Sequence, residues 1–433
     1  MYLCGLKYAD MRIYFLMIRI AALLGHRKAR LIIKGQRDVA KTIAAPLVWR
    51  DGGSNHEGPI WFHAASVGEF EQARPIIEKL HAAHPEEKIL ITFFSPSGYE
   101  LRKNYALADK VLYLPFATPR RAKKFLDAVR PKMAIFVKYE FWPAYLKEIH
   151  KRGIPLYSVS AIFRPNQLFF KPWGKWYRRL LDNFDCIFVQ DEASKTLLEG
   201  GPGALKDSGA TPDQKGPEVI VTGDTRFDRV MRVAARSGCG PGGLQLVEQF
   251  VEGCSNVLVA GSTWPEDEAL IAQYIAARPD VKIVIVPHET DRTHLHYIFN
   301  LFEGRMMYYS ETRNYLPTGI RTLVIDTVGL LSHIYRYGQV AYIGGGFGVG
   351  IHNTIEAAVY GVPVIFGPQY ERFREAKGLI DAGAAESIKT YPQLEGALDK
   401  AFAEHERMGK NALDYVQSEL GATEKIYHAL FHT

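Results

Sequence analysis

Two carboxylates in the N-terminal half of the chain lie where enzymes place acid–base groups. Glu69 ends the segment S-V-G-E at residues 66–69, shortly after the apolar run Ile60–His63 and directly before a helical run. Glu140 follows the apolar run Met133–Val137 in the segment K-Y-E-F-W-P. Side chains at strand ends line the ligand crevice of open α/β sheets. Both glutamates are therefore candidates for acid–base chemistry; the plain alternative is a residue that only complements the dipole of a helix start.

Glu69 is the stronger of the two candidates. Its small neighbours, Ser66 and Gly68, keep the backbone accessible and are expected acceptor contacts. A carboxylate near a helix N-terminus is expected to stay ionised. We therefore expect Glu69 to take a proton from an acceptor hydroxyl.

A glycine-rich segment in the C-terminal half has the pattern of a nucleotide-binding loop. It covers residues 344–350, follows the apolar run Val340–Ile343 and precedes a helical run, Glu356–Tyr360. Glycines let the backbone approach a ligand closely, and a helix N-terminus offers unpaired N–H groups to a phosphate. The carboxylate of Glu356 is expected to accept hydrogen bonds from ribose hydroxyls. The alternative is a flexible turn with a structural glutamate.

A second segment supports the nucleotide interpretation. Residues 261–263 (G-S-T) also follow a strand and precede a helix, so two loops are expected to flank one ligand. Arg226 and His288 are candidate cations for a phosphate. The sequence contains no D-x-D triplet, so we expect neither a metal nor another cofactor. His288, His294 and His296 are more typical of loop and helix surfaces than of a metal site.

These residues require strands and helices that place them. Short apolar runs alternate with helical patterns, which is typical of parallel sheets covered by helices. The predicted strands are Ile60–His63, Ile89–Phe93, Val111–Leu114, Met133–Val137, Leu156–Val159, Cys186–Val189 and Val219–Val221, then Val257–Ala260, Lys282–Val286, Thr322–Ile325, Val340–Ile343 and Val362–Phe366. Predicted helices include Glu71–His81, Pro119–Val129 and Pro265–Ala277. We expect an α/β fold with two Rossmann-like domains facing each other across a cleft.

The length and composition agree with two folded domains. A chain of 433 residues exceeds one ordinary core, and 47% hydrophobic with 23% charged residues is typical of a globular protein. The four cysteines form no C-x-x-C pair, which favours a reducing compartment over a zinc site or disulfide framework. Gly- and Pro-rich stretches separate the expected parts of the chain. The expected parts are a basic segment at 1–45, a first domain at 46–230, a linker at 231–255, a second domain at 256–411 and a helix at 412–433 that packs back on the first domain.

The N-terminal segment has a local excess of positive charge. The first 50 residues hold ten Lys or Arg against two acidic residues, although the whole chain has a net charge of only +6. Within it, 13–24 is apolar except for Arg19, which is too short for a membrane span and has no convincing signal cleavage site. A basic, apolar helix can lie on an anionic membrane surface. The alternative is a helix that packs on the protein itself, and nucleic acid is not an expected partner.

In their order and spacing these segments resemble the Kdo transferases of lipid A biosynthesis. The resemblance rests on S-V-G-E at 66–69, Y-E-F-W-P at 139–143, G-S-T at 261–263, D-T-V-G at 326–329, and H-N-T-I-E at 352–356 through G-P at 367–368. Members of this family have the GT-B fold and an N-terminal region that meets the inner membrane. They transfer 3-deoxy-D-manno-octulosonic acid (Kdo) from CMP-Kdo to a lipid A precursor, with inversion and without a metal. The resemblance therefore implies this activity at the cytoplasmic face of a bacterial inner membrane.

The resemblance also implies roles for individual residues. It makes Glu69 the base and Glu140 an acceptor-site residue, next to Ser66 and Gly68. It implies donor contacts for Ser262, Thr263, Gly345, Asn353 and Glu356. Together with the loop residues Gly346 and Thr354 and the cations Arg226 and His288, these form the expected donor site.

The chain departs from the family pattern at three places. Gly350-Ile351 stands where the family has two glycines before the histidine. Arg226 replaces a lysine, which keeps the charge but not its geometry. Leu330 replaces an acidic residue after the D-T-x-G motif. These changes predict a divergent branch of the family.

Three other functions remain open at this point. A GT-B enzyme with a uridine nucleotide donor has the same type of glycine loop and ribose glutamate. A non-catalytic relative would bind a nucleotide sugar without turnover, although the presence of both Glu69 and Glu140 argues against it. A peripheral membrane scaffold would explain the basic N-terminus but not the two phosphate-type loops.

Overall fold

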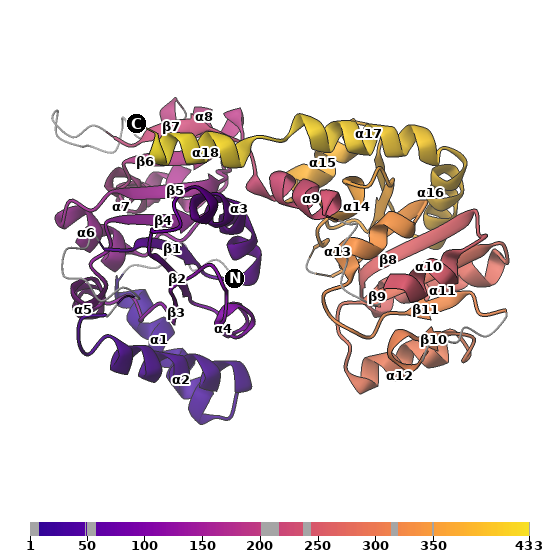
Figure 1. Cartoon of the computed structure of the whole chain (residues 1–433), viewed down its shortest axis with the longest axis horizontal. Helices are drawn as coiled ribbons and strands as arrows, with labels where there is room; N and C mark the ends of the chain where they lie inside the picture. The colour runs from indigo at the N-terminus through magenta and orange to yellow at the C-terminus, as the bar shows by residue number, and fades with distance from the viewer. Residues whose placement is uncertain are drawn as a thin grey trace. The chain divides into compact units, whose positions relative to one another are not determined.

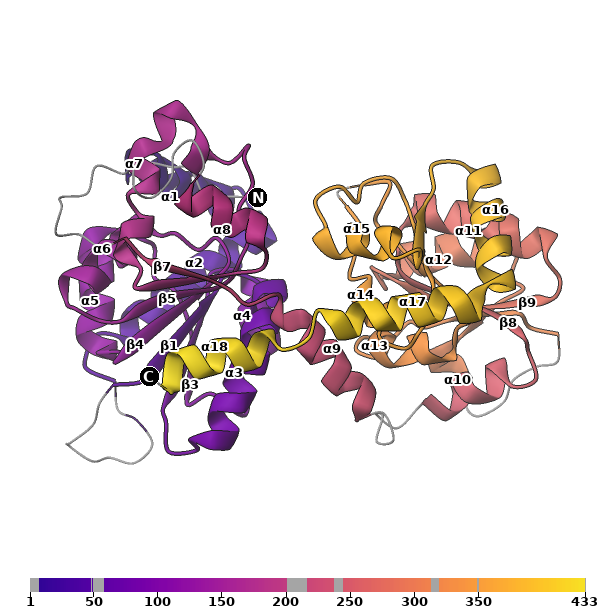
Figure 2. The ribbon, with the colours of Figure 1, turned by 90° about the horizontal axis from the view of Figure 1, so that it is seen from above.

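The computed structural model describes residues 8–47, 49, 58–200, 216–236, 244–312, 319–348 and 350–432. The chain forms two compact units (Figures 1 and 2). The N-terminal unit comprises Met1–Arg229 and Gly421–Thr433, and the C-terminal unit comprises Val230–Leu420. Each unit is built on one parallel sheet of seven strands, with helices packed against it. The predicted fold class, two Rossmann-like α/β domains, is confirmed.

The sheet of the N-terminal unit has the strand order β3-β2-β1-β4-β5-β6-β7. Its strands are β1 Ile60–Ala64, β2 Ile89–Phe93, β3 Lys110–Tyr113, β4 Met133–Val137, β5 Leu156–Ala161, β6 Cys186–Val189 and β7 Glu218–Val221. The central strands are buried on both faces, so they appear in the sequence as continuous apolar runs. Successive residues point to opposite faces: Trp61 belongs to one core cluster and Phe62 to the other.

Helices cover both faces of this sheet. They are α1 Tyr8–Leu23, α2 Arg27–Thr42, α3 Val67–Ala83, α4 Pro96–Arg102, α5 Pro119–Val129, α6 Pro143–Lys151, α7 Lys175–Arg178, α8 Glu192–Glu199 and α18 Ala422–Phe431, with α9 Thr225–Ala235 at the boundary between the units. One core cluster joins the sheet to α1, α2, α5 and α6. The other joins it to α3 and α18. Asp228 ties α18 to the unit by accepting hydrogen bonds from the backbone N–H groups of Gly421 (2.7 Å) and Thr423 (2.6 Å).

Helices α1 and α2 form a hairpin that is anchored to the sheet edge. Phe15 of α1 stacks on Phe116 with ring centroids 4.2 Å apart. On α2, the Gln36 side chain donates to the carbonyl of Leu114 (2.9 Å) and accepts from the backbone N–H of Phe116 (2.8 Å). Gly35 fits against the ring of Tyr113, where an added Cβ would lie 2.4 Å from a ring carbon. The hairpin is therefore an integral part of the N-terminal unit.

The same hairpin also presents apolar side chains to solvent. Eleven large hydrophobic residues are exposed in the described part of the chain, and six of them lie on α1 and the turn after it: Ile13, Leu16, Met17, Ile20, Leu23 and Leu24. We call these six residues the α1 stripe, since their spacing places them along one side of the helix. The sequence offered a membrane-surface helix and a packed helix as alternatives; α1 packs through one side and exposes another. None of the helices in the described ranges combines the length and hydropathy of a membrane span.

The sheet of the C-terminal unit has the order β10-β11-β9-β8-β12-β13-β14. Its strands are β8 Asn256–Thr263, β9 Val281–Pro287, β10 Met307–Tyr308, β11 Thr322–Val324, β12 Val340–Ile343, β13 Val364–Phe366 and β14 Ala385–Ser387. Its helices are α10 Leu244–Val251, α11 Pro265–Ala277, α12 Arg292–Leu301, α13 Leu331–Ile334, α14 Ile355–Ala358, α15 Arg374–Asp381, α16 Tyr391–Ala403 and α17 His405–Ser418.

Several element boundaries differ from the predictions. The single helix predicted at 412–433 is two helices, and only α18 belongs to the N-terminal unit, because Gly421 at φ +100° breaks the helix. The region predicted as a linker, 231–255, contains the end of α9 and all of α10. The short edge strands β10 and β14 were not predicted, since two or three residues show no recognisable pattern.

Candidate active site

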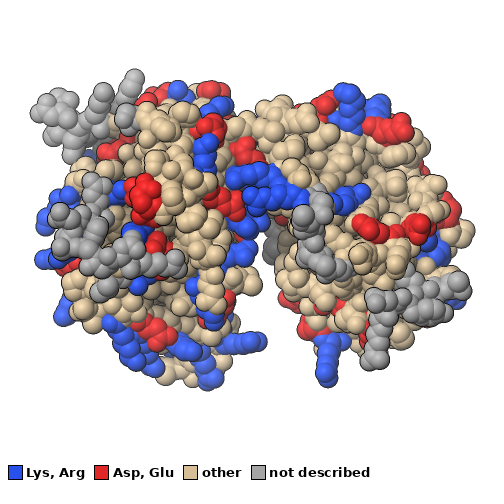
Figure 3. Space-filling view, viewed as in Figure 1, with Lys and Arg blue, Asp and Glu red and all other residues tan. Residues whose placement is uncertain are grey.

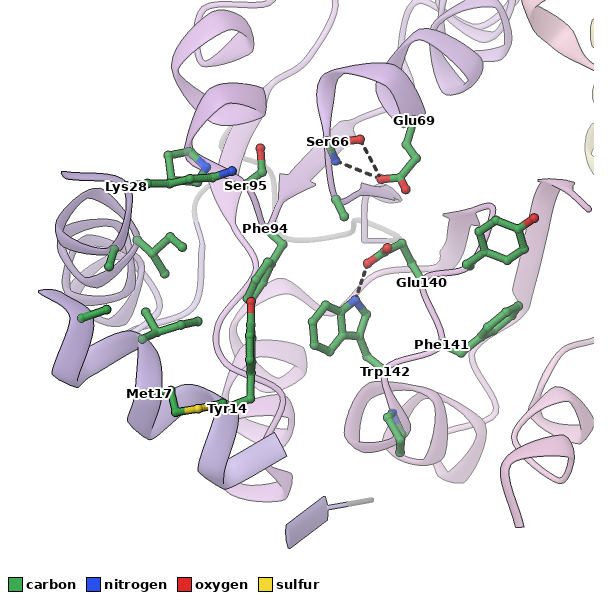
Figure 4. Close-up of a pocket in the computed structure, with 18 of the residues that line it drawn as sticks. Tyr14, Met17, Lys28, Ser66, Glu69, Phe94, Ser95, Glu140, Phe141 and Trp142 are labelled. Carbon is green, nitrogen blue, oxygen red and sulfur yellow. Dashed lines mark hydrogen bonds between the residues drawn. The ribbon is translucent and has the colours of Figure 1, made fainter. Parts of the chain in front are cut away.

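A pocket of about 710 Å³ in the N-terminal unit contains the predicted acid–base residues. The loops after β1, β2 and β4 form one side of it, and α1 and α2 form the other. Figure 4 shows Ser66, Glu69 and Glu140 on the first side. Met17 and Lys28 lie on the opposite side. The two predicted carboxylates and the N-terminal hairpin therefore line the same pocket.

The S-V-G-E segment connects β1 to α3, and Ser66 is the N-cap of that helix. The backbone N–H of Ser66 donates to Oε2 of Glu69 (2.9 Å), and the Ser66 hydroxyl donates to the same oxygen (3.2 Å). Among the described residues, no recorded hydrogen bond ends on Oε1 of Glu69. Glu69 thus caps the helix start through Oε2, and Oε1 accepts no hydrogen bond from the described residues. Gly68 is exposed and does not line the pocket; an added Cβ there would meet nothing within 4 Å.

The environment of Glu69 favours its protonated form. Burial is the main cause and the nearby Glu140 the second, and together they raise the pKa of Glu69 to about 8, against smaller opposing effects of Lys138 and Ser66. Burial and Glu140 thus act against the expected ionisation of this carboxylate at the helix start. A carboxylate with a pKa near the working pH is a stronger base than an ordinary glutamate.

Glu140 belongs to a chain of buried hydrogen bonds. Its Oε2 accepts from the indole N–H of Trp142 (2.6 Å) and lies 3.2 Å from Nε2 of His63. Nδ1 of His63 lies 2.8 Å from the hydroxyl of Thr92, and that hydroxyl accepts from the indole N–H of Trp61 (2.8 Å). All these groups are satisfied when Thr92 donates to Nδ1 and Nε2–H of His63 donates to Glu140. Glu140 is therefore held in one orientation at the pocket wall.

Several residues of this site were not predicted. His63 and Trp142 lie inside segments that the sequence singled out, but no role was assigned to them. The available signals were a histidine one residue before the end of β1 and a tryptophan two residues after Glu140. Tyr14, Ala29 and the other hairpin residues of the pocket wall gave no signal, because they lie far from Glu69 in sequence.

Arg226 lies in the N-terminal unit, whereas the other donor candidates lie in the C-terminal unit. Its Nε and Nη2 donate to Oδ2 of the buried Asp224 (2.9 and 2.7 Å). Burial of Asp224 works in the opposite direction, but the charge and hydrogen bonds of Arg226 lower the pKa of Asp224 to about 2. Gln72 donates to Oδ1 of the same carboxylate (3.1 Å). Much of the hydrogen-bonding capacity of Arg226 is thus used within its own segment.

The two phosphate-type loops of the C-terminal unit are in contact; that they flank one ligand stays a prediction. β8 and β12 are neighbouring strands, and Gly344 fits so closely against Ser262 that an added Cβ would lie 2.2 Å from the Ser262 carbonyl oxygen. Gly345 has φ +89°, which only glycine adopts readily. An added Cβ at Gly346 would lie 2.6 Å from the Cα of Gly367. These glycines therefore allow three backbone segments to approach each other closely.

Two buried acids of α11 accept hydrogen bonds from these loops. Asp267 accepts from the backbone N–H of Gly345 (2.9 Å), the backbone N–H of Trp264 (3.0 Å) and the hydroxyl of Tyr342 (2.7 Å). Glu268 accepts from the hydroxyl of Thr263 (2.8 Å). The start of α11, predicted as a phosphate site, is therefore already capped by a protein carboxylate.

The Thr263 side chain does not face a donor as expected, and His294, expected on a surface, is buried. The Thr263 side chain is fully buried and donates to Glu268, so only its backbone faces the loop. Glu268 also lies 2.8 Å from Nε2 of His294. His288 is exposed and stacks on Trp264 with centroids 4.8 Å apart. In the described residues, no group of three or more His, Cys, Asp or Glu side chains is arranged to hold a metal ion.

The segment after the glycine loop has polar atoms without protein partners. Asn353 Nδ2 donates to Glu356 (2.9 Å), but its Oδ1 is buried and has no hydrogen-bond partner among the described residues. The hydroxyl of Thr354 is also buried and, within the same part of the chain, unpartnered. α14 has only four residues, so it provides a weaker helix N-terminus than the predicted run. Unpaired buried polar atoms indicate a place where a ligand completes the hydrogen bonds.

Comparisons with known proteins identify related chains. Residues 34–229 match the family model described as 3-deoxy-D-manno-octulosonic-acid transferase (kdotransferase). The chain is 26% identical to a 3-deoxy-D-manno-octulosonic acid transferase of Aquifex aeolicus, with 78% of this chain and 85% of that protein covered. It is also 26% identical to the transferase of the same description from Bordetella pertussis, with 86% of each chain covered. The solved UDP-GlcNAc 2-epimerase of Neisseria meningitidis has the same fold, with a TM-score of 0.58, 16% identity, and 87% of this chain and 100% of that chain covered.

Two Rossmann-like units form a fold of GT-B type, and the relationship to 3-deoxy-D-manno-octulosonic acid transferases supports a glycosyltransferase. The resemblance read from the sequence is confirmed: this chain is related over most of its length to the 3-deoxy-D-manno-octulosonic acid transferases. An identity of about one residue in four agrees with a divergent branch.

Proposed function

We propose that this protein transfers Kdo from CMP-Kdo to a glucosamine hydroxyl of a lipid A precursor, lipid IVA, at the cytoplasmic face of a bacterial inner membrane. The observation that carries the proposal is Glu69, a carboxylate of raised pKa on the wall of a pocket that reaches an exposed apolar helix. The relationship to the Kdo transferases supplies the donor and acceptor class.

In the proposed mechanism, Glu69 acts as the general base. Oε1 takes the proton of the acceptor hydroxyl while Oε2 stays bonded to Ser66, so the base moves little during the reaction. The acceptor oxygen then forms a bond to the anomeric carbon of Kdo as the bond from that carbon to the CMP phosphate breaks. A single displacement of this kind inverts the anomeric configuration. Ser66 and Glu140 orient the acceptor sugar, and Gly68 leaves open space above the helix start.

The donor is held by the C-terminal unit in this proposal. The unpartnered atoms of Asn353 and Thr354 and the carboxylate of Glu356 contact the nucleoside, with the ribose hydroxyls donating to Glu356. The backbone N–H of Gly346, the backbone of Thr263, and Ser262 and His288 surround the phosphate, while Gly345 shapes the loop and donates its own N–H to Asp267. Arg226 stays a predicted cation for the phosphate, although its Nε and Nη2 already donate to Asp224. CMP leaves with a single phosphate, whose charge these groups can meet without a metal or other cofactor.

The N-terminal hairpin is the proposed membrane contact. The α1 stripe presents apolar side chains, and α2 carries six Lys or Arg in 16 residues against one acidic residue. Figure 3 shows Lys and Arg side chains gathered over this part of the N-terminal unit. Apolar side chains beside a basic helix match an anionic bilayer surface, and each basic group adds about 1 kcal/mol near the headgroups.

The test is incubation of the purified full chain with CMP-Kdo, generated in situ, and a tetra-acylated lipid A precursor, followed by mass spectrometry of the lipid. We expect a product heavier by one or more Kdo residues. Parallel reactions with UDP-GlcNAc and other nucleotide sugars test the donor. Transfer from a uridine nucleotide in place of CMP-Kdo, or no transfer from any donor, would contradict the proposal.

A further inference from the structure

The lining of the pocket beside Glu69 divides into a polar and an apolar part. Ser66, Ser95 and the two glutamates form the polar part, with His26 and Lys28 at the hairpin edge. The rest of the wall is mainly apolar or aromatic, and includes Phe94 and Trp142. Its volume of about 710 Å³ is in the range of pockets that enclose organic ligands, roughly 300–1,000 Å³. Such a division matches an amphiphilic ligand rather than a free sugar.

Helix α1 faces the pocket with a second row of residues. Tyr14, Met17, Ile18 and Ala21 line the pocket, and their spacing of three and four residues places them on one side of the helix. Met17 belongs both to this row and to the exposed α1 stripe. The apolar wall of the pocket is therefore continuous with the exposed apolar surface of the same helix.

Helix α2 completes the wall. Ala29 and Ile32 are buried against the core and also line the pocket, whereas Lys28 is exposed at its edge. Figure 4 shows Phe94 between the hairpin side of the pocket and the side that carries the glutamates. A ligand with its hydroxyl at Glu69 thus has a path past aromatic rings and the hairpin to the α1 stripe.

We infer that this pocket holds an acyl chain of the lipid acceptor, with the sugar at Glu69 and Glu140 and the chain running along α1 and α2 toward the α1 stripe. The inference rests on the proposed function, because it assigns a part of that acceptor to this pocket. It adds that the enzyme recognises the acyl chain in a protein pocket, in addition to any contact with the bilayer. The hairpin is then part of the acceptor site as well as a membrane contact.

The test compares acceptors that differ only in their acyl chains, in detergent solution without a bilayer. We expect the wild-type enzyme to use the fully acylated acceptor with a kcat/KM at least tenfold above that of the deacylated acceptor. Shortening the chain should raise KM by up to about fourfold for each methylene that leaves the pocket. Equal use of acylated and deacylated acceptors would overturn the inference, while the transfer itself would still support the proposed function.

A pocket-filling variant separates this site from the outer surface of the hairpin. Ala21→Trp should lower the preference for the acylated acceptor by about tenfold or more, because the indole occupies the space of the chain. Ala40→Trp on α2 is the matched control, since Ala40 is exposed and does not line the pocket. If both variants keep the wild-type preference, or both lose it equally, the pocket assignment is wrong.

A second variant tests the same pocket in case Ala21→Trp fails to fold. Met17→Glu changes an exposed side chain at the pocket mouth, so the fold should be retained, as checked by thermal unfolding. It should raise KM for the acylated acceptor more than for the deacylated one. An equal change for both acceptors would overturn the inference. Absence of transfer to every acceptor by the wild-type chain would instead remove the proposed function.

Discussion

The two units bury carboxylates for different purposes. In the N-terminal unit, Glu69 has one oxygen outside the capping hydrogen bonds and faces a pocket. In the C-terminal unit, Asp267 and Glu268 are almost fully buried, and hydrogen bonds from neighbouring loops use both oxygens of each. A buried acid is therefore not by itself a sign of catalysis. The distinguishing feature is an acceptor atom that the protein leaves unused beside an accessible cavity.

The largest expected effect comes from Glu69→Gln. Glutamine still accepts hydrogen bonds from Ser66 at the helix start, so the melting temperature should stay within about 2 °C of the wild type. Loss of the base should lower kcat by about 10²–10⁴-fold, measured by product mass spectrometry or CMP release. Glu78→Gln on the same helix is the control and should keep near wild-type turnover. A Glu69→Gln enzyme of near wild-type rate would show that this carboxylate is only a cap.

Asp267→Ala tests the structural acid. Alanine accepts none of the three hydrogen bonds that the carboxylate accepts, so we expect a loss of about 3 kcal/mol in the free energy of unfolding. Because Gly345 and Trp264 then lose their common anchor, KM for the donor should rise by about tenfold or more, with a smaller change in kcat. Urea unfolding and donor titrations measure the two effects. Glu266→Gln, its exposed neighbour, should change neither. A collapse of kcat with normal stability and donor KM would instead make Asp267 a chemical group.

Thr92→Val tests the hydrogen-bond chain that orients Glu140. Valine has nearly the same shape, but it leaves the indole N–H of Trp61 and Nδ1 of His63 without their hydroxyl partner. We expect a loss of about 1–3 kcal/mol in the free energy of unfolding and a several-fold rise in KM for the acceptor. Thr92→Ser should recover most of both. If Thr92→Ser behaves like Thr92→Val, the effect arises from packing and not from the hydroxyl.

The smallest effect concerns the pH dependence of turnover. Because Glu69 must be deprotonated to act as a base and its pKa is about 8, kcat/KM should rise with pH up to about 8 and then level off. Glu140→Gln removes the second cause of the raised pKa and should move the rising limb to lower pH, by less than about one unit since burial remains. A rising limb near the ordinary glutamate pKa in the wild type would contradict this account.

The sequence alone determined most strands of the two sheets and the candidate residues at their ends. Parallel strands that are buried on both faces appear as continuous apolar runs, so strands such as Ile60–Ala64 and Val340–Ile343 were located nearly to the residue. Their carboxyl ends then indicated Glu69, Glu140 and the glycine loop, because these turns are local in sequence. The short edge strands β10 and β14 had too few residues to show such a pattern.

Only the tertiary structure decided the burial and the hydrogen-bond partners of each candidate residue. Whether Glu69 is ionised depends on burial and on Glu140, which is 71 residues away in the chain. The side chains of Thr263 and Arg226 looked available until Glu268 and Asp224 were placed beside them. The wall of the pocket comes from a hairpin that no local pattern connects to Glu69. Protonation, hydrogen-bond saturation and cavity shape all depend on neighbours distant in sequence, and only the folded chain brings those neighbours together.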